Sequence, residues 1–442
     1  MDILPSISAG KVEFNSLDIN RGDIFVTLSS GARNGSEFAL DALERGAGAV
    51  ITDKHIAVES QKVIYVQDPE MALRKMAIYK RERAENIIAI TGSCGKTSTK
   101  EATNFLLSLY AKSFANRGTF NNFIGVPLTL ASIPNDSEFI SLEIGMSNLS
   151  EIRELTKLAR PNYAIITNIG TAHLESLGSV ENICRAKCEI FENMEGPKIG
   201  IINADTQYFE LQKQIAKTFG IEIYTIAKDS KADCVLENFE IDAGQASVEY
   251  NIMGTKIKTI SNVFGAHQSV NLCAPLLLIK LLGLDIQKAA NHISNIFAPS
   301  GRGQSFYKHI NGKKIFVIDD SYNANPDSVK ASLKTFTDVK GKKILILADM
   351  LELGQDSASM HVNLKHNVID SGASTIYCIG EMMHYLHQEL KNEISSIYFA
   401  DIENDVFRHI FKNISEEDCS VLIKGSKGTQ ISQFVDYIKS HF

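Results

Sequence analysis

A chain of 442 residues is longer than one hydrophobic core usually serves, and at roughly 150 residues per domain it predicts about three domains. Its formal net charge is −7 and its basic residues are scattered, which argues against nucleic acid or an anionic membrane surface as a partner. No run approaches the roughly 18 apolar residues of a membrane span and the first residues lack a signal-peptide pattern, so we expect a cytoplasmic protein without membrane insertion.

Residues 1–84 combine short apolar runs with one helical stretch. The runs DIFVTL, GAVIT and KVIYVQ predict strands, and SEFALDALERGA predicts a helix. Asp68 and Pro69 then have the chemistry of a helix start, and the helix that they open ends in a charged run. We therefore expect residues 1–84 to form a small α/β domain.

Residues 85–299 repeat a pattern of strand, turn and helix. Near-continuous apolar strands such as IIAIT, FISLEIGM and YAIITNIG alternate with helical stretches, which predicts a mostly parallel sheet covered on both faces. Residues 233–260 differ, because alternating segments joined by glycine turns predict antiparallel hairpins at the sheet edge. We expect this central domain to be of the P-loop type.

Residues 300–442 begin after the break APSGRGQ, which carries a proline and two glycines. The strands KKIFVID, KKILILAD, TIYCIG, SIYFA and SVLIKG then alternate with helices, which predicts a Rossmann-like α/β domain. The seven cysteines of the chain form no C-x-x-C pair and no zinc pattern, so we expect reduced thiols, with Cys184 and Cys188 as core or flanking residues.

The segment TGSCGKTSTK resembles a shortened phosphate-binding loop. A buried strand precedes it and a helix follows it, so its backbone N–H groups and the positive end of the helix converge where a phosphate would lie. An ordinary glycine turn with a chance Lys-Thr pair is the alternative, but this context favours a nucleotide site. The predicted nucleotide-binding residues here are Gly92, Ser93, Cys94, Gly95, Lys96, Thr97 and Ser98.

Further segments occur in the order found in one enzyme family. Beside the glycine loop they are TFNNFIGVPLTL, LEIGM, TNIGTAHLESLGS with AKCEIF, DDSYNANPDS, ADMLELG and LIKGS. From about residue 20 onward the chain therefore resembles the Mur ligase family. The glycine loop is also shared by folylpolyglutamate synthases, whereas DDSYNANPDS and ADMLELG favour D-Ala-D-Ala as the incoming amine.

The resemblance implies ATP-driven amide formation in peptidoglycan precursor synthesis. A substrate carboxylate takes the γ-phosphoryl group of ATP, and an amine then attacks the acyl phosphate. The expected cofactors are ATP and Mg²⁺, and the expected substrates are UDP-MurNAc-tripeptide and D-Ala-D-Ala, handled by a monomer in the bacterial cytoplasm. Alternatives are another Mur-type amino-acid-adding ligase, a folylpolyglutamate synthase, or a module that hydrolyses ATP as a switch; the third domain lacks the D-N-P-R string of the first alternative.

Residue roles follow from the same resemblance. Phosphoryl transfer is catalysed by positioning and charge neutralisation, so cations and metal ligands are expected rather than a nucleophile. The resemblance implies catalytic roles for Lys96, Glu143, His173, Lys187 and Arg302. It implies metal ligation by Thr97, Glu143, His173 and Lys187, the last as a carbamate formed with CO₂.

Other positions are implied to bind the substrates. Asn271, Arg302 and Asp319 are expected to contact ATP, with Arg302 arriving from the start of the third domain. The expected substrate-binding residues are Asn122, Tyr322, Asn323, Asn325 and Lys424. The first domain is expected to hold the uridine diphosphate part of the large substrate.

Overall fold

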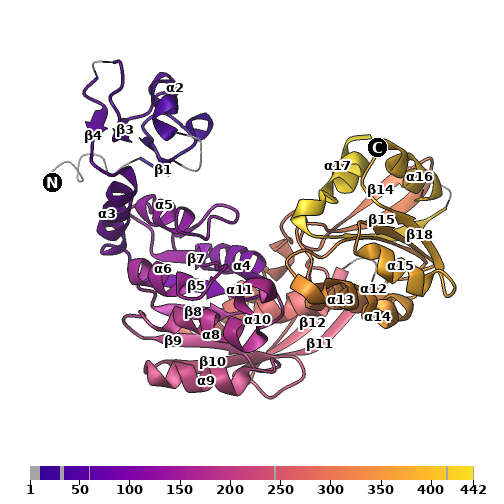
Figure 1. Cartoon of the computed structure of the whole chain (residues 1–442). Coiled ribbons are helices and arrows are strands. Elements are labelled where there is room, and N and C mark those ends of the chain that lie inside the picture. Colours follow the sequence, from indigo (N-terminus) through magenta and orange to yellow (C-terminus); the bar gives the residue numbers. More distant parts are fainter. Residues whose placement is uncertain (1–9, 30–33, 59, 243–244, 415–416, 442) are drawn as a thin grey trace.

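The computed structural model describes residues 10–29, 34–58, 60–242, 245–414 and 417–441. These residues form three β-sheets in three lobes (Figure 1), here called N-terminal, central and C-terminal. The N-terminal and C-terminal lobes rise on opposite sides of the central lobe, so that the molecule has the outline of a V. The predicted fold class, an α/β protein with large, mostly parallel sheets, is confirmed.

The N-terminal lobe is a small parallel sheet with strand order β1-β2-β3-β4. A short helix, α2 (Ala39–Glu44), packs beside it. The strands are β1 (Val12–Glu13), β2 (Ile24–Val26), β3 (Ala49–Thr52) and β4 (Val63–Tyr65).

Helix α3 (Pro69–Arg81) leads from this lobe into the central one. Its start agrees with the sequence, because the Asp68 side chain accepts a hydrogen bond from the backbone N–H of Met71 and Pro69 fills the first turn. Apolar residues at helical spacing, including Leu73 and Met76, bury one face of α3 in the core that also contains α5.

The central sheet has the order β13-β12-β11-β10-β9-β8-β5-β7-β6. The strands from β6 to β11 pair in parallel, and the predicted edge hairpins are confirmed by antiparallel pairing of β11, β12 and β13. The strands are β5 (Asn86–Thr91), β6 (Ser113–Ala115), β7 (Phe139–Glu143), β8 (Tyr163–Ile166), β9 (Ile199–Asn203), β10 (Glu222–Ala227), β11 (Cys234–Asp242), β12 (Gln245–Ile252) and β13 (Thr255–Ser261).

Helices cover both faces of this sheet, which explains its apolar strands. In β5, Ile87 and Ala89 join one core while Ile88 and Ile90 join the core on the opposite face. The central helices are α4 (Lys96–Ser108), α5 (Gly125–Ala131), α6 (Glu151–Ala159), α7 (Leu174–Leu177), α8 (Val180–Cys188), α9 (Phe209–Thr218), α10 (Ala266–Leu281) and α11 (Ile286–Ala290).

The C-terminal sheet has the order β14-β15-β19-β16-β17-β18, parallel except for the β14–β15 hairpin. Its strands are β14 (Gln304–Ile310), β15 (Lys313–Asp320), β16 (Lys342–Ala348), β17 (Thr375–Ile379), β18 (Ser395–Phe399) and β19 (Cys419–Lys424). Its helices are α12 (Pro326–Thr337), α13 (Ser357–Val362), α14 (Lys365–Asp370), α15 (Met383–Leu390), α16 (Asn404–Ile414) and α17 (Ser432–His441).

Two negative findings apply to the described residues. Within them, no helix has the length and apolar character needed to cross a bilayer. All seven cysteines are unpaired, and Cys184 and Cys188 are buried on α8.

Candidate active site

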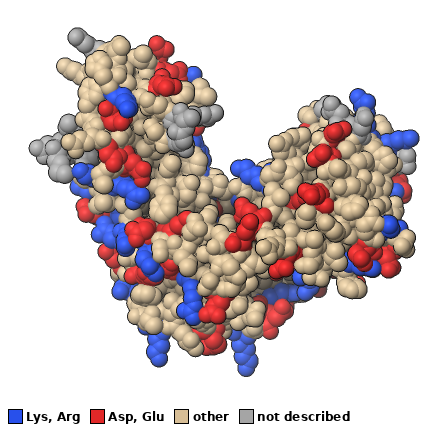
Figure 2. Space-filling model, in the orientation of Figure 1, with Lys and Arg blue, Asp and Glu red and all other residues tan. Residues whose placement is uncertain are grey.

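A cavity of about 750 Å³ lies between the central and C-terminal lobes. Figure 2 shows the surface deeply hollowed between the two raised lobes. No described residue before Ser93 lines the cavity, so the N-terminal lobe does not reach it. The predicted site residues that line it are Ser93, Cys94, Gly95, Lys96, Ser98, Asn122, Glu143, His173, Asn271, Arg302, Tyr322, Asn323, Asn325 and Lys424.

Four predicted site residues do not line the cavity. Gly92 and Thr97 lie behind the loop surface, and Lys187 and Asp319 are each 1% exposed.

The glycine loop connects the end of β5 to the first turn of α4. Gly95 adopts a left-handed φ of 81° at the N-cap of α4, and a Cβ there would lie 2.4 Å from Asn271 Nδ2. Glycine is therefore needed both for the turn and for the close approach of Asn271. Lys96 Nζ donates to the Gly92 carbonyl oxygen at 2.6 Å, so the lysine lies folded over the loop.

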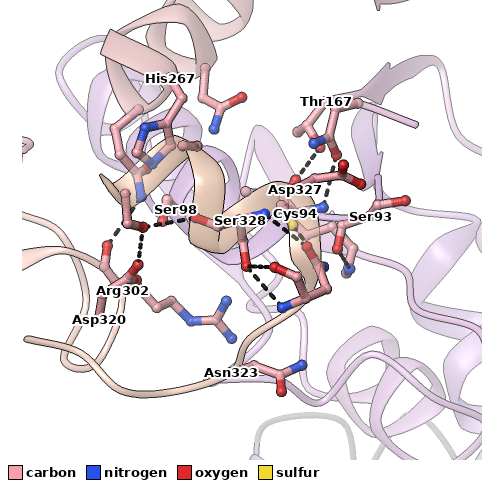
Figure 3. A pocket seen from close by; sticks show the side chains of 18 of the residues that line it. Ser93, Cys94, Ser98, Thr167, His267, Arg302, Asp320, Asn323, Asp327 and Ser328 are labelled. Carbon is pink, nitrogen blue, oxygen red and sulfur yellow. Dashed lines mark hydrogen bonds between the residues drawn. The ribbon is translucent and has the colours of Figure 1, made fainter. Parts of the chain in front are cut away.

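The loop is braced by the segment that follows β8. Ser93 Oγ accepts a hydrogen bond from Gly170 N at 2.9 Å, and Cys94 N donates to Asn168 Oδ1 at 2.8 Å. In Figure 3, Ser93 and Cys94 lie close to Asp327 and Ser328 of the C-terminal lobe. The two lobes therefore meet at the predicted phosphate loop.

Thr97 and Glu143 form a buried pair behind the loop. Glu143 ends β7 with 1% exposure, and its Oε2 accepts from Thr97 Oγ1 at 2.7 Å. Its Oε1 accepts from Asn121 Nδ2 at 2.7 Å. The Glu143 carboxylate at the end of β7 is therefore buried and hydrogen-bonded rather than solvated. A buried carboxylate beside a loop threonine has the oxygen ligands that Mg²⁺ prefers.

His173 precedes α7 in a left-handed conformation with φ of 67°. Burial, with further contributions from the ammonium groups of Lys187 and Lys96, lowers the pKa of His173 to about 4. The imidazole is consequently neutral near pH 7, which is the form that ligates metals. Its Nδ1 lies 3.5 Å from the exposed carboxylate of Glu352 on the C-terminal lobe.

Lys187 lies on α8 and is 1% exposed, so it is not a surface helical lysine. Burial first, and then the nearby Lys96 ammonium, lower the pKa of Lys187 well below its usual value. No hydrogen bond or ion pair joins its amine to another described residue. A lowered pKa favours the neutral amine, which is the form that reacts with CO₂ to give a carbamate.

The donor set at this end of the cavity fits Mg²⁺ only in part. Among the described residues, no group of three His, Cys, Asp or Glu side chains converges on one point. Thr97, Glu143 and His173 offer a hydroxyl, a carboxylate and a neutral imidazole, and a carbamate on Lys187 would add the missing anionic oxygens.

Arg302 and Tyr322 bring cationic and aromatic groups from the start of the C-terminal lobe. The Arg302 guanidinium carbon lies 3.8 Å from the centre of the Tyr322 ring, so the two side chains stack. The Tyr322 hydroxyl donates to Thr119 Oγ1 of the central lobe at 3.3 Å. This stack holds the guanidinium, a positively charged group with several N–H donors, at the lining of the cavity.

Adjacent aspartates at the end of β15 have different surroundings. Asp319 accepts hydrogen bonds from Gly301 N at 2.9 Å and from Ser321 Oγ, so it fastens the turn that carries Arg302. Asp320 lines the cavity, and its Oδ2 accepts from Lys424 Nζ at 2.7 Å. Lys424 is buried beside this carboxylate at the end of β19.

Two asparagines of the predicted site also serve as caps or contacts. Asn325 caps α12 through Ser328, and its Nδ2 donates to Cys94 Sγ at 3.2 Å. Asn122 Oδ1 accepts from Gly125 N at 2.9 Å at the start of α5. Asn325 and Asn122 therefore cap helices and also line the cavity.

Several lining residues were not singled out by the sequence. Asn168 follows β8 at the same sheet edge as Glu143, and that position was a usable signal. Asp327 and His267 also line the cavity. Asp327 lies inside the segment DDSYNANPDS, which was a usable signal, whereas His267 carried none in the sequence.

Comparison with known proteins places the chain in a family. Residues 90–279 match the Mur ligase middle domain, and residues 301–427 match the Mur ligase, glutamate ligase domain. The chain belongs to the Mur ligase family, as its fold and its glycine loop indicate.

Three similar proteins illustrate the comparison, one by sequence and two by structure. The UDP-N-acetylmuramoyl-tripeptide--D-alanyl-D-alanine ligase of Rickettsia prowazekii is 38% identical over 99% of this chain and 97% of its own length. MurF from Acinetobacter baumannii has a similar structure, with a TM-score of 0.84, 24% identity and coverage of 98% and 97% of the two chains. MurF from Thermotoga maritima, solved in complex with ADP, gives a TM-score of 0.81, 24% identity and coverage of 99% and 98%.

Proposed function

We propose that this protein is an ATP-dependent ligase that joins D-Ala-D-Ala to a UDP-MurNAc-tripeptide in peptidoglycan precursor synthesis. One observation carries the proposal. The phosphate loop, the carboxylate of Glu143 and the cations Arg302 and Lys424 all border one cavity between two lobes, and Thr97 holds Glu143 from behind the loop. Family membership and the name of the Rickettsia prowazekii relative support the same conclusion.

The reaction has two steps. The terminal carboxylate of the tripeptide attacks the γ-phosphorus of ATP, the bond to the bridging oxygen breaks, and ADP leaves. The amine of D-Ala-D-Ala then attacks the carbonyl carbon of the acyl phosphate and loses a proton, and phosphate departs with one former carboxylate oxygen. Neither step needs a protein nucleophile, so catalysis depends on position and charge.

The central lobe supplies the groups that hold the triphosphate. The loop of residues 92–98 cradles the phosphates with backbone N–H groups from the first turn of α4, since those of Ser93 and Cys94 already donate to Asn168. Lys96 turns from the Gly92 carbonyl to the β- and γ-phosphates. Asn271, which lies against Gly95, is proposed to face the adenine.

Mg²⁺ is the proposed second cofactor, held by Thr97, Glu143, His173 and a carbamylated Lys187. When bound, it neutralises charge that develops on the transferred phosphoryl oxygens. Glu143 and Thr97 are already fixed by hydrogen bonds, so their positions change little when the ion enters.

The C-terminal lobe supplies the groups for the incoming dipeptide and for the γ-phosphate. Arg302, stacked on Tyr322, is proposed to contact ATP, with Asp319 fastening the turn that carries it. The dipeptide is proposed to bind Tyr322, Asn323, Asn325 and Lys424, with Asn122 opposite them on the central lobe.

We assign residues 1–84 to the uridine diphosphate of the large substrate, 85–299 to ATP and 300–442 to the dipeptide. We further propose that the enzyme works as a monomer in the bacterial cytoplasm. No described residue of the N-terminal lobe lines the cavity, so the long UDP-MurNAc-tripeptide would extend from that lobe into it.

The test is phosphate release measured with each amine acceptor in turn. We expect release to require UDP-MurNAc-tripeptide and to be stimulated by D-Ala-D-Ala. Stimulation by L-Lys, diaminopimelate or L-Glu instead would assign the chain to another amino-acid-adding ligase or to a folylpolyglutamate synthase. ATP hydrolysis that no acceptor increases would indicate a nucleotide switch.

A further inference from the structure

A buried lysine outside the predicted site, Lys100, lies one helical turn after Lys96 on α4. Its side chain is 0% exposed, although lysine normally keeps its ammonium in water. Its Nζ donates to the carbonyl oxygens of Asn116 at 2.6 Å and Gly118 at 3.2 Å, and it lies 2.6 Å from Glu101 Oε1. These acceptors satisfy the charge and tie α4 to the segment after β6.

That segment, residues 116–122, is named the connector loop because it contacts all three lobes. Toward the N-terminal lobe, Arg117 pairs with the buried carboxylate of Glu13 at 3.4 Å. Toward the C-terminal lobe, Thr119 Oγ1 accepts from the Tyr322 hydroxyl at 3.3 Å. The connector loop therefore links the central lobe to both outer lobes, where the substrates are proposed to bind.

The connector loop also holds both the backbone and the carboxylate of Glu143. Asn116 Oδ1 accepts from Glu143 N at 2.8 Å, and Asn116 Nδ2 donates to the Glu143 carbonyl oxygen at 3.2 Å, which fixes the backbone. Asn121 Nδ2 donates to Glu143 Oε1 at 2.7 Å, which fixes the carboxylate. The second carboxylate oxygen is held by Thr97 on α4.

We propose that Lys100 is a positioning residue for Glu143, a role that rests on the proposed function of the site. Helix α4 starts with Lys96 of the proposed phosphate loop and Thr97, which donates to the Glu143 carboxylate. One turn later, Lys100 anchors the connector loop, which holds the same carboxylate in position. One rigid helix thus sets the distance between the phosphate-binding lysine and the metal-binding carboxylate. Without the ammonium, two loop carbonyl groups lose their partner and the loop shifts.

The first test measures ATP binding by calorimetry with Mg²⁺ and with a chelator. For Lys100→Met we expect unchanged ATP affinity in chelator, because Lys96 and the loop remain, and a Mg²⁺ requirement raised about 10- to 100-fold. Lys100→Arg, which keeps the donor charge, should recover most of the loss. Lys112→Met, the same change at an exposed lysine paired with Asp136, is the matched control.

A second readout reports the position of the loop without any substrate. The chain has no tryptophan, so Phe123→Trp, at a partly exposed position just after the connector loop, gives a single tryptophan whose emission can be excited selectively. In this background Lys100→Met should shift the emission to the red and increase quenching by acrylamide. Lys112→Met should change neither.

An unaltered Mg²⁺ requirement in folded Lys100→Met would overturn the proposal. If the tryptophan emission shifts while the Mg²⁺ requirement stays the same, Lys100 has a purely structural role. If Lys100→Met does not fold, Asn121→Ala cuts the same link at its other end and must raise the Mg²⁺ requirement. ATP binding to the unsubstituted protein separates the two claims, since its absence would refute the proposed function itself.

Discussion

Asp327 and Thr171 are 156 residues apart and join the C-terminal lobe to the central lobe. Asp327 Oδ2 accepts hydrogen bonds from Thr171 N at 2.9 Å and from Thr171 Oγ1 at 3.0 Å. A Cβ on Gly170 would lie only 2.6 Å from the same oxygen, so the contact requires glycine there. Gly170 N in turn donates to Ser93 Oγ of the phosphate loop, so docking of the lobes and the shape of that loop are connected.

Asp327→Asn is therefore expected to weaken lobe docking rather than folding. The amide keeps the size of the side chain but loses the charge that strengthens both hydrogen bonds, worth about 1.5 kcal/mol or roughly tenfold in kcat/KM for D-Ala-D-Ala. ATP affinity should be nearly unchanged. Gly170→Ala should lower kcat/KM for D-Ala-D-Ala in the same way. Thr171→Ser keeps both donors and should leave kcat/KM unchanged. Equal activity in all three variants would contradict the role of this contact.

Lys96→Met should abolish ATP turnover while leaving the fold intact. Among the described residues, Lys96 Nζ donates only to carbonyl groups of the loop, so its removal breaks no core interaction. Loss of one cation at the transferred phosphate is expected to lower kcat by at least about 100-fold. Steady-state phosphate release and thermal unfolding are the two measurements. Normal turnover in a folded variant would remove the loop from the mechanism.

Lys187→Ala tests the carbamate. The variant should be inactive and should regain activity with short-chain carboxylates such as acetate, because the space left by the buried side chain accepts a free carboxylate. The unsubstituted enzyme should lose activity when CO₂ is removed and recover with bicarbonate, since the low pKa of Lys187 keeps its amine reactive. Failure of both rescues would count against carbamylation.

His267 predicts a loss of stability in mild acid. Burial lowers its pKa to about 4, against opposition from Asp320 and with a smaller contribution from Lys424, and its Nδ1 has no partner among the described residues. Above pH 6.5 the imidazole is neutral in both states, so its contribution is fully present. As pH falls from 6.5 toward 4, only the unfolded chain takes up the proton, so stability is lost.

The matched variant for this prediction is His267→Gln. Between pH 7.5 and pH 5 its free energy of unfolding in urea should fall by about 2 kcal/mol less than that of the unsubstituted protein. Equal losses in the two proteins would mean that His267 is protonated normally in the folded state.

Local chemistry made much of the site predictable. The turn from β5 into α4 is determined by residues that are adjacent in the sequence. A charged residue such as Glu143 at the end of an apolar strand needs a partner, which indicates a site. The outer ends of β15 and β19 were predictable for the same reason, because parallel strands present their carboxyl ends at one edge. These features depend on residues that are neighbours in sequence.

Other parts depend on packing that sequence patterns do not encode. Asp319 and Asp320 are adjacent at a strand end, and only the structure shows that Asp320 faces the cavity while Asp319 fastens the turn before β14. Lys100 and Lys187 look like surface helical lysines until the tertiary structure buries them. The Asp327–Thr171 contact exists only because two lobes dock.

The most direct test of the proposed chemistry follows one oxygen atom. UDP-MurNAc-tripeptide labelled with ¹⁸O in its terminal carboxylate is incubated with ATP, Mg²⁺ and D-Ala-D-Ala, and the products are analysed by mass. We predict an amide-linked UDP-MurNAc-pentapeptide together with phosphate that carries one labelled oxygen. Phosphate without the label, or a product lacking D-Ala-D-Ala, would contradict ligation through an acyl phosphate.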